Sequence, residues 1–192
     1  MSEPNQVQSP NLPEILETSL LSSRNVFLSG VVDGHQARRL QAELLTLEQQ
    51  DAEKPIVLWI NSPGGEVHSG FAIYDMIRFV RPTVITIVSG AAASMGSLIA
   101  LAAEKENRLA TANAKFLLHQ PLVGGTIQGP ASDIEIHARD ILKLKVKILD
   151  QYADRTGHPR EYFEKVMERD HWLTADEALE IGLVSRVIQK RD

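Results

Sequence analysis

The residues that could most readily take part in a chemical reaction lie in a run of small side chains, SGAAASMGSLIA, at positions 89–100. Ser94 follows the apolar stretch TVITIV and a series of alanines, and Met95 and Gly96 come next. In hydrolases a nucleophilic serine often lies on a sharp turn from strand to helix, where small neighbours expose its hydroxyl. The strict G-x-S-x-G pattern fails because position 92 is alanine. The run alone is compatible with a reactive serine or with a helix packed closely through small residues.

A serine hydroxyl is a weak nucleophile without a base, and a base needs an acid to orient it. Among six histidines, His119 ends the apolar stretch KFLLH, and sites form where parallel strands give way to loops. Asp170 in ERDHWLT is the candidate acid, whereas Asp176 and Glu177 are explained as first-turn residues of a helix. A structural histidine and a solvated turn aspartate are the alternatives that these residues leave open.

The segment NSPGGE provides a tight turn, because Pro63 fixes one backbone angle and two glycines follow it. Glycines at positive φ can direct a backbone N–H toward a ligand, and a pair of such donors could hold the oxyanion of acyl transfer. A plain strand-to-helix turn or a phosphate loop are the alternatives. The signal for phosphate is weak, since neither G-x-G-x-x-G nor G-x-x-x-x-G-K is present.

Strand and helix patterns alternate along the chain, which predicts a parallel sheet with helices outside it. We expect capping boxes at SDIE, residues 132–135, and at residues 174–177. The expected strands cover residues 25–32, 55–61, 83–88, 115–119 and 183–188, and the expected helices cover 35–50, 70–80, a stretch from about 93, 132–155, 158–169 and 174–182.

Composition excludes several classes of protein. The 192 residues suit one domain, and a formal net charge of -5 gives no basic surface for nucleic acid. The chain has no cysteine, which excludes disulfides, cysteine zinc sites and a cysteine nucleophile, and fits a reducing, cytoplasmic location. No basic residue precedes Arg24, so neither a secretory signal nor a mitochondrial transit peptide is expected. Residues 83–103 are uncharged, but their order predicts a buried strand, a turn and a buried helix rather than a membrane span.

Four segments together resemble the Clp protease family, the caseinolytic serine peptidases. The resemblance covers about residues 24–190. The four segments are INSPGGEVHSGFAIYDMI, GAAASMGSLIALAA, HQPLVGG followed by SDIEIHARDILKLK, and ERDHWLTADEALEIGLVSRVI.

Matched residue by residue, the resemblance implies that Ser94 is the nucleophile, His119 the general base and Asp170 the acid. Gly65 and Met95 match the positions whose backbone N–H groups form the oxyanion hole. The resemblance implies no metal and no cofactor in this subunit, because ATP is used by a partner ATPase. The order Ser, His, Asp along the chain differs from the Ser, Asp, His order of α/β-hydrolases.

The implied fold is α/β and crotonase-like, a Clp protease-type superhelix of repeated strand-strand-helix units with a protruding handle helix. Residues 1–23 would form a flexible N-terminal, axial segment, and residues 24–192 a single domain with its handle at about 120–155. Two stacked seven-membered rings would enclose a chamber that hydrolyses unfolded proteins to small peptides, delivered by a Clp-type AAA+ unfoldase. The helix from Ser132 is apolar on more than one face, which separately predicts burial against a neighbouring subunit.

Three features depart from the family pattern. EILETSLLSSR stands where a basic, tyrosine-containing segment is usual, the loop PLVGGTIQGP after His119 is about two residues longer, and Val57 replaces an aromatic residue near Trp59. These departures favour, as an alternative, a paralogue that works in a mixed ring with a second Clp protease subunit type. A crotonase-type acyl-CoA enzyme and a catalytically silent ring subunit are further alternatives, although such silent subunits normally lose residues of the triad.

Overall fold

The computed structural model describes residues 12–122 and 128–190. Its elements follow one another as α1 (Leu12–Ser22), β1 (Asn25–Ser29), α2 (Gly34–Gln50), β2 (Ile56–Ser62), α3 (Val67–Phe79), β3 (Val84–Ala93), α4 (Met95–Ala100), a short 3-10 turn (Lys105–Asn107), β4 (Arg108–Thr111), β5 (Lys115–Leu118), α5 (Ala131–Thr156), α6 (Arg160–Val166), β6 (His171–Thr174), α7 (Ala175–Glu180) and β7 (Arg186–Ile188).

One sheet organises the molecule, with the strand order β1-β2-β3-β4-β7 and with β5 and β6 branching from β3. The first part of β3 pairs with β4, and its last residues, Ala91–Ala93, pair with β5. The register between β2 and β3 shifts after Ile60, where Gly90 takes a positive φ of 109°. All pairs are parallel except β5 with β6. The two ends of β3 therefore belong to different branches, and its C-terminal end lies beside β5.

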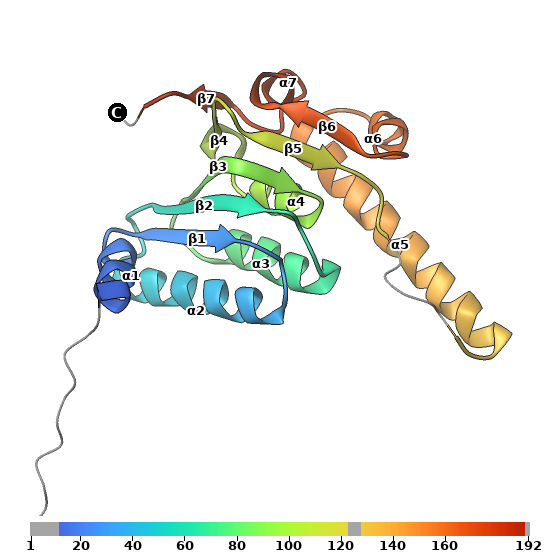
Figure 1. Ribbon diagram of the computed structural model, residues 1–192, viewed down its shortest axis with the longest axis horizontal. Helices are drawn as coiled ribbons and strands as arrows, with labels where there is room; N and C mark the ends of the chain where they lie inside the picture. The colour runs from blue at the N-terminus through green and yellow to red at the C-terminus, as the bar shows by residue number, and fades with distance from the viewer. Residues whose placement is uncertain (1–11, 123–127, 191–192) are drawn as a thin grey trace, which may run out of the picture.

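Figure 1 shows α2 and α3 below β1 and β2, and α4 continues this layer beside β3 and against α3. Helix α2 buries Leu40, Leu44 and Leu47 at helical spacing, as the sequence predicts. The strands β2 and β3 are nearly continuous apolar runs, which fits strands covered on both faces. The result is one connected core cluster that extends from Val26 to Val184.

Helix α5 leaves this body, and Figure 1 shows its first half projecting beyond the sheet. Only Ile148, Leu149 and Tyr152 of this helix are buried, all in its C-terminal half. Ile136 and Leu142 in the projecting half are each 62% exposed. The predicted fold class, α/β with a protruding handle helix, is thus observed.

Several expectations are wrong in detail. Residues 12–22 form a helix, whereas the whole of 1–23 was expected to be flexible; Pro13 lies in the first turn, where it costs no hydrogen bond, and the partly buried Leu21 packs against the core. The rest of that expected segment, residues 1–11, lies outside the described residues. Helix α5 begins after Pro130 without a side-chain cap, so the expected capping box at Ser132 is absent. Its Ser132 hydroxyl bonds Asp133 instead.

Two short strands, β4 and β6, were not expected from the sequence. The capping box of Thr174 with Glu177 is confirmed, with both of its hydrogen bonds present. Residues 83–103 form β3, the turn at Ser94 and α4, as predicted. Within the described ranges, no helix is both long and apolar enough to cross a bilayer.

Candidate active site

Ser94 lies at the turn between β3 and α4 with φ 54° and ψ -122°, a conformation that is uncommon for a residue with a side chain. Its N–H donates to the carbonyl of Leu117 on β5 at 2.9 Å. Its own carbonyl accepts the N–H groups of Ser97 at 3.0 Å and Leu98 at 3.3 Å. Ser94 is the N-cap residue of α4, yet its side chain accepts no capping bond. The turn therefore presents the Ser94 hydroxyl without using it to hold the helix.

Gly64 packs directly against this turn. A Cβ at position 64 would lie 2.6 Å from the carbonyl oxygen of Ala93 and 2.7 Å from the Cβ of Ser94. Gly64 also has a φ of +88°, which disfavours any side chain. The glycine turn and the serine turn can approach this closely only because position 64 is glycine.

Gly65 is the next residue of this glycine turn. It has a φ of +154°, and a Cβ there would meet the carbonyl oxygen of Val32 at 2.1 Å. The backbone groups on either side of Gly65 are hydrogen-bonded: the Val32 N–H donates to the Gly64 carbonyl, and the Glu66 N–H donates to the Val32 carbonyl, each at 2.8 Å. In the described part of the chain, the N–H groups of Gly65 and Met95 donate to no other protein group. Both residues line the pocket that contains Ser94.

His119 follows directly after β5 and lines the same pocket. Because Ala93 pairs with Leu117 in parallel register, Ser94 and His119 emerge from the same ends of adjacent strands. Two hydrogen bonds fix the next residue, Gln120. Its backbone N–H donates to the carbonyl of Met167 at 2.9 Å, and its side-chain amide donates to the backbone carbonyl of Glu168 at 3.2 Å. The buried Nδ1 of His119 has no hydrogen-bond partner among the described residues.

Asp170 makes no hydrogen bond to His119 in the part of the chain that the structure describes. Leu118 pairs with His171 at the end of the antiparallel β5–β6 ladder, so His119 and Asp170 are the first residues beyond its last pair. Asp170 is nevertheless exposed and does not line the pocket, and the Nδ1 of His119 has no acceptor within residues 12–122 and 128–190. The structure brings Ser94 and His119 to one pocket, and Asp170 is not among the residues that line it.

The pocket has a volume of about 260 Å³ and is mainly apolar beyond its polar edge. Its lining residues are Pro63, Gly65, Val67, Ser94, Met95, Leu98, His119, Pro121, Leu122, Ile148, Tyr152 and Met167. Two of them, Ile148 and Tyr152, come from α5, so the handle helix forms part of the wall.

The model of the Clp protease family matches residues 12–191 of this chain. The chain belongs to the Clp protease family. Members of this family are serine-type endopeptidases, and the chain is a proteolytic core subunit of that kind with the crotonase-like fold of the family.

Curated relatives support the same assignment. The chain is 45% identical over 177 residues to the ATP-dependent Clp protease proteolytic subunit 1 of Chlamydia muridarum, covering 92% of this chain and 92% of that protein. It is also 45% identical to the protein of the same name from Chlamydia pneumoniae, over 92% of this chain and 93% of that one. The protein of that name from Chlamydia trachomatis serovar D is 44% identical over the same share of this chain.

A second pocket of this Clp protease subunit, of about 410 Å³, lies away from the Ser94 pocket. It includes Trp59 and Val57 of β2, Ile87 of β3 and Ile188 of β7. The Trp59 ring nitrogen donates to the Asn25 side chain at 2.9 Å, which fixes the indole in this pocket. The described residues contain no group of three or more His, Asp or Glu side chains arranged to hold a metal ion.

Sequence reasoning did not single out two residues beside Ser94, one in the lining of its pocket and one bonded to its carbonyl. Tyr152 reaches the pocket from α5, and Ser97 bonds both Tyr152 and the Ser94 carbonyl. Ser97 lies in the same small-residue run as Ser94, which is a weak signal. Tyr152 gives no signal of its own, because one aromatic residue in an apolar helix is typical of a core.

Proposed function

We propose that this Clp protease subunit cleaves peptide bonds with Ser94 as nucleophile, His119 as general base and Asp170 as the acid that orients His119. The observation that carries the proposal is the strained Ser94 turn, which opens into one pocket with His119 and with two unused backbone donors. Strain of this kind persists where the surroundings impose it, and it concentrates at functional sites.

In this mechanism His119 takes the proton of the Ser94 hydroxyl as the oxygen attacks the peptide carbonyl. The N–H groups of Gly65 and Met95 stabilise the oxyanion of the tetrahedral intermediate. His119 then gives the proton to the leaving amine, and water repeats the sequence on the acyl-enzyme. Asp170 holds the imidazole in the tautomer that leaves Nε2 free to accept the proton.

This role requires Asp170 to close onto His119. The two residues lie next to the last pair of the β5–β6 ladder, Leu118 with His171, and the Nδ1 of His119 is a buried donor or acceptor without a partner in the described part of the chain. A buried polar atom without a partner is unfavourable, so a short movement that brings the carboxylate to Nδ1 would be stabilised. We infer that neighbouring subunits or the bound substrate complete this hydrogen bond.

Assembly into two stacked seven-membered rings is part of the proposal. The projecting half of α5 exposes Ile134, Ile136, Leu142 and Val146, more apolar surface than an isolated helix in water would carry. Burial of this face between subunits explains why the helix extends beyond its own core. Light scattering with size-exclusion chromatography tests the point, and a stable monomer of 21.3 kDa would contradict it.

The subunit would receive unfolded chains from a Clp-type AAA+ ATPase, as the words "ATP-dependent" in the relatives' names suggest. The pocket around Trp59 is our candidate for the ATPase contact. Those relatives are numbered subunit 1, which supports the alternative of a mixed ring with a second subunit type. The absence of cysteine supports work in a reducing, cytoplasmic compartment.

The decisive experiment replaces Ser94 with alanine. We expect cleavage of a short fluorogenic peptide to fall by about 10⁴- to 10⁶-fold, because the nucleophile is lost while the fold remains. Covalent labelling by a fluorophosphonate should also disappear. Ser22→Ala, which changes an exposed serine at the end of α1, should leave both signals at the parent level. Cleavage by the Ser94 variant at close to the parent rate would overturn the assignment.

A further inference from the structure

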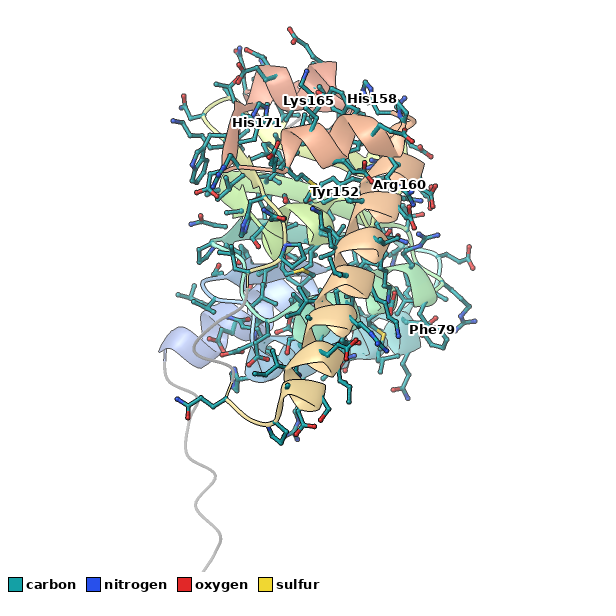
Figure 2. All side chains as sticks on the ribbon, turned by 90° about the vertical axis from the view of Figure 1, so that its right-hand side faces the viewer. Phe79, Tyr152, His158, Arg160, Lys165 and His171 are labelled. Atoms are coloured by element: carbon teal, nitrogen blue, oxygen red, sulfur yellow. The ribbon has the colours of Figure 1, made fainter. Side chains whose placement is uncertain are left out.

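Two buried hydroxyls outside the Ser–His–Asp set lie in contact beside the nucleophile. The Ser97 Oγ on α4 and the Tyr152 hydroxyl on α5 are 2.5 Å apart, and each residue is only 1% exposed. Figure 2 labels Tyr152 near the C-terminal part of α5, where α6 lies against the helix. The Tyr152 ring packs on Phe163 of α6 with the ring centres 5.3 Å apart. The phenol is therefore held in place by two helices.

The direction of the hydrogen bonds follows from the neighbouring acceptors. The Ser97 Oγ lies 2.7 Å from the carbonyl oxygen of Ser94 and 3.2 Å from that of Leu117. Carbonyl oxygens can only accept, so the single proton of Ser97 points to them. Tyr152 must then donate to Ser97. Burial raises the pKa of Tyr152, which keeps its hydroxyl protonated and able to donate.

This arrangement bears directly on the strained turn. The Ser97 hydroxyl binds the carbonyl of Ser94 itself, and the Leu117 carbonyl beside it also accepts the Ser94 N–H. Leu117 precedes His119 by two residues on the same stretch of chain. A residue at φ 54° remains there only if several contacts impose that conformation. The Tyr152–Ser97 pair adds such a contact from a helix 55 positions away in the sequence.

We propose that Tyr152 is a positioning residue for Ser94, acting through Ser97, and that this link makes the nucleophile sensitive to the position of the handle helix α5. The inference rests on the proposed role of Ser94 as nucleophile. A change in the projecting half of α5 would reach Ser94 through one rigid helix and two hydroxyls.

The test compares Tyr152→Phe, Ser97→Ala and the double variant with the parent, all as the assembled full chain. Each single variant removes the link, so we expect kcat for a short peptide and the rate of fluorophosphonate labelling to fall together, by about 3- to 10-fold, as for one net hydrogen bond. KM should stay at the parent value, because each variant removes a buried hydroxyl that bonds toward the Ser94 turn and leaves the Tyr152 ring or its phenyl equivalent in the pocket wall. The double variant should be no slower than the slower single variant, since the two hydroxyls act as a unit.

Tyr74→Phe is the matched control. Tyr74 on α3 is also a buried tyrosine, 2% exposed, and its hydroxyl bonds Gln151 on α5, the helix of Tyr152, at 2.6 Å. Tyr74 does not line the Ser94 pocket. Its loss should leave kcat and the labelling rate unchanged. If Tyr152→Phe does not fold, Ser97→Ala removes the same link from the other end and decides the question.

Two results would overturn the proposal: parent-like kcat and labelling in Ser97→Ala and Tyr152→Phe, or an equal loss in Tyr74→Phe. These outcomes are distinct from failure of the proposed function. If the parent is not labelled at Ser94 at all, the catalytic assignment itself is wrong. If the parent is labelled and the variants react equally fast, only the positioning role is wrong.

Discussion

The pocket has two sides, a serine wall around Ser94 and a histidine wall around His119, and a single chain holds the first more firmly than the second. On the serine wall, the N–H and the carbonyl of Ser94 are both hydrogen-bonded, and Gly64 fits against the turn with no space for a side chain. On the histidine wall, the Nδ1 of His119 has no partner in the described ranges, and Asp170 is exposed. Leu122, which also lines the pocket, is 76% exposed.

The difference follows from where each wall lies in the sheet. Ser94 directly follows β3, a ten-residue strand with neighbours on both sides, so its position is set by the centre of the core. His119 directly follows the four-residue β5, whose outer neighbour β6 is the last strand of its branch. An edge of this kind has fewer contacts to fix it and is the part of a fold that neighbours can adjust. The position of Ser94 is thus fixed within one chain, whereas the imidazole of His119 is held by fewer contacts.

Replacing Asp170 with asparagine tests whether the open wall closes during catalysis. We expect kcat to fall by about 10³- to 10⁴-fold, because the imidazole would lose the carboxylate that selects its tautomer. The measurement is peptide hydrolysis by the assembled protein.

Asp176→Asn, an exposed aspartate of α7, serves as the matched control and should keep the parent rate. If Asp170→Asn also stays at the parent rate, the carboxylate does not orient His119. His119 would then act without the hydrogen bond from its Nδ1 to Asp170.

Replacing Gly64 with alanine breaks the serine wall. The new Cβ would push against the Ala93 carbonyl and the Ser94 Cβ, and a displacement of about 1 Å at a nucleophile costs on the order of 10²-fold in rate. We expect that loss in kcat and in fluorophosphonate labelling.

Gly34→Ala is the control for this change, because a Cβ at position 34 meets nothing within 4 Å. It should leave both rates unchanged. Parent-like labelling of a folded Gly64→Ala protein would show that the serine wall tolerates movement and that the contrast between the walls is wrong.

The sequence predicts the serine wall better than the histidine wall, for a physical reason. The strand, turn and helix around Ser94 are consecutive in the chain, and their apolar runs, small residues and glycines identify them locally. His119 could be placed at a strand end from KFLLH, which the structure bears out. Its relation to Asp170 depends on β6, a four-residue strand with the sequence HWLT, which carries no clear alternation.

Long-range contacts are the part that sequence patterns do not specify. The strand β4, RLAT, is buried because β3 and β7 flank it, not because its own residues are strongly apolar. The bond between Ser97 and Tyr152 joins positions 55 apart, and no spacing rule links two such residues. Helix α1 was not expected because the resemblance implied a flexible axial segment up to residue 23, yet a helix forms over 12–22.

The smallest effect that we predict concerns Thr174, which ends β6 and caps α7 on the histidine side of the pocket. Its hydroxyl accepts the Glu177 N–H at 3.3 Å and bonds the Glu177 carboxylate at 2.8 Å. Thr174→Ala should lower the free energy of unfolding by about 1 kcal/mol, as for the loss of one helix cap, and the Tm by about 2–4 °C. Differential scanning calorimetry at matched protomer concentration measures this change.

The pH dependence of the same variant follows from the carboxylate. Hydrogen bonds from the backbone N–H and then the side chain of Thr174 hold the pKa of Glu177 below its ordinary value of 4.5. A lowered pKa stabilises the fold above that value and less so as the pH falls, so the Tm difference between parent and variant should shrink below pH 4.5. Thr83→Ala, an exposed threonine without a capping role, should show neither the shift nor its pH dependence. Because β6 leads from Asp170 to Thr174, a large loss of activity in Thr174→Ala would mean that the histidine wall relies on this cap, whereas an unchanged rate would confine its effect to stability.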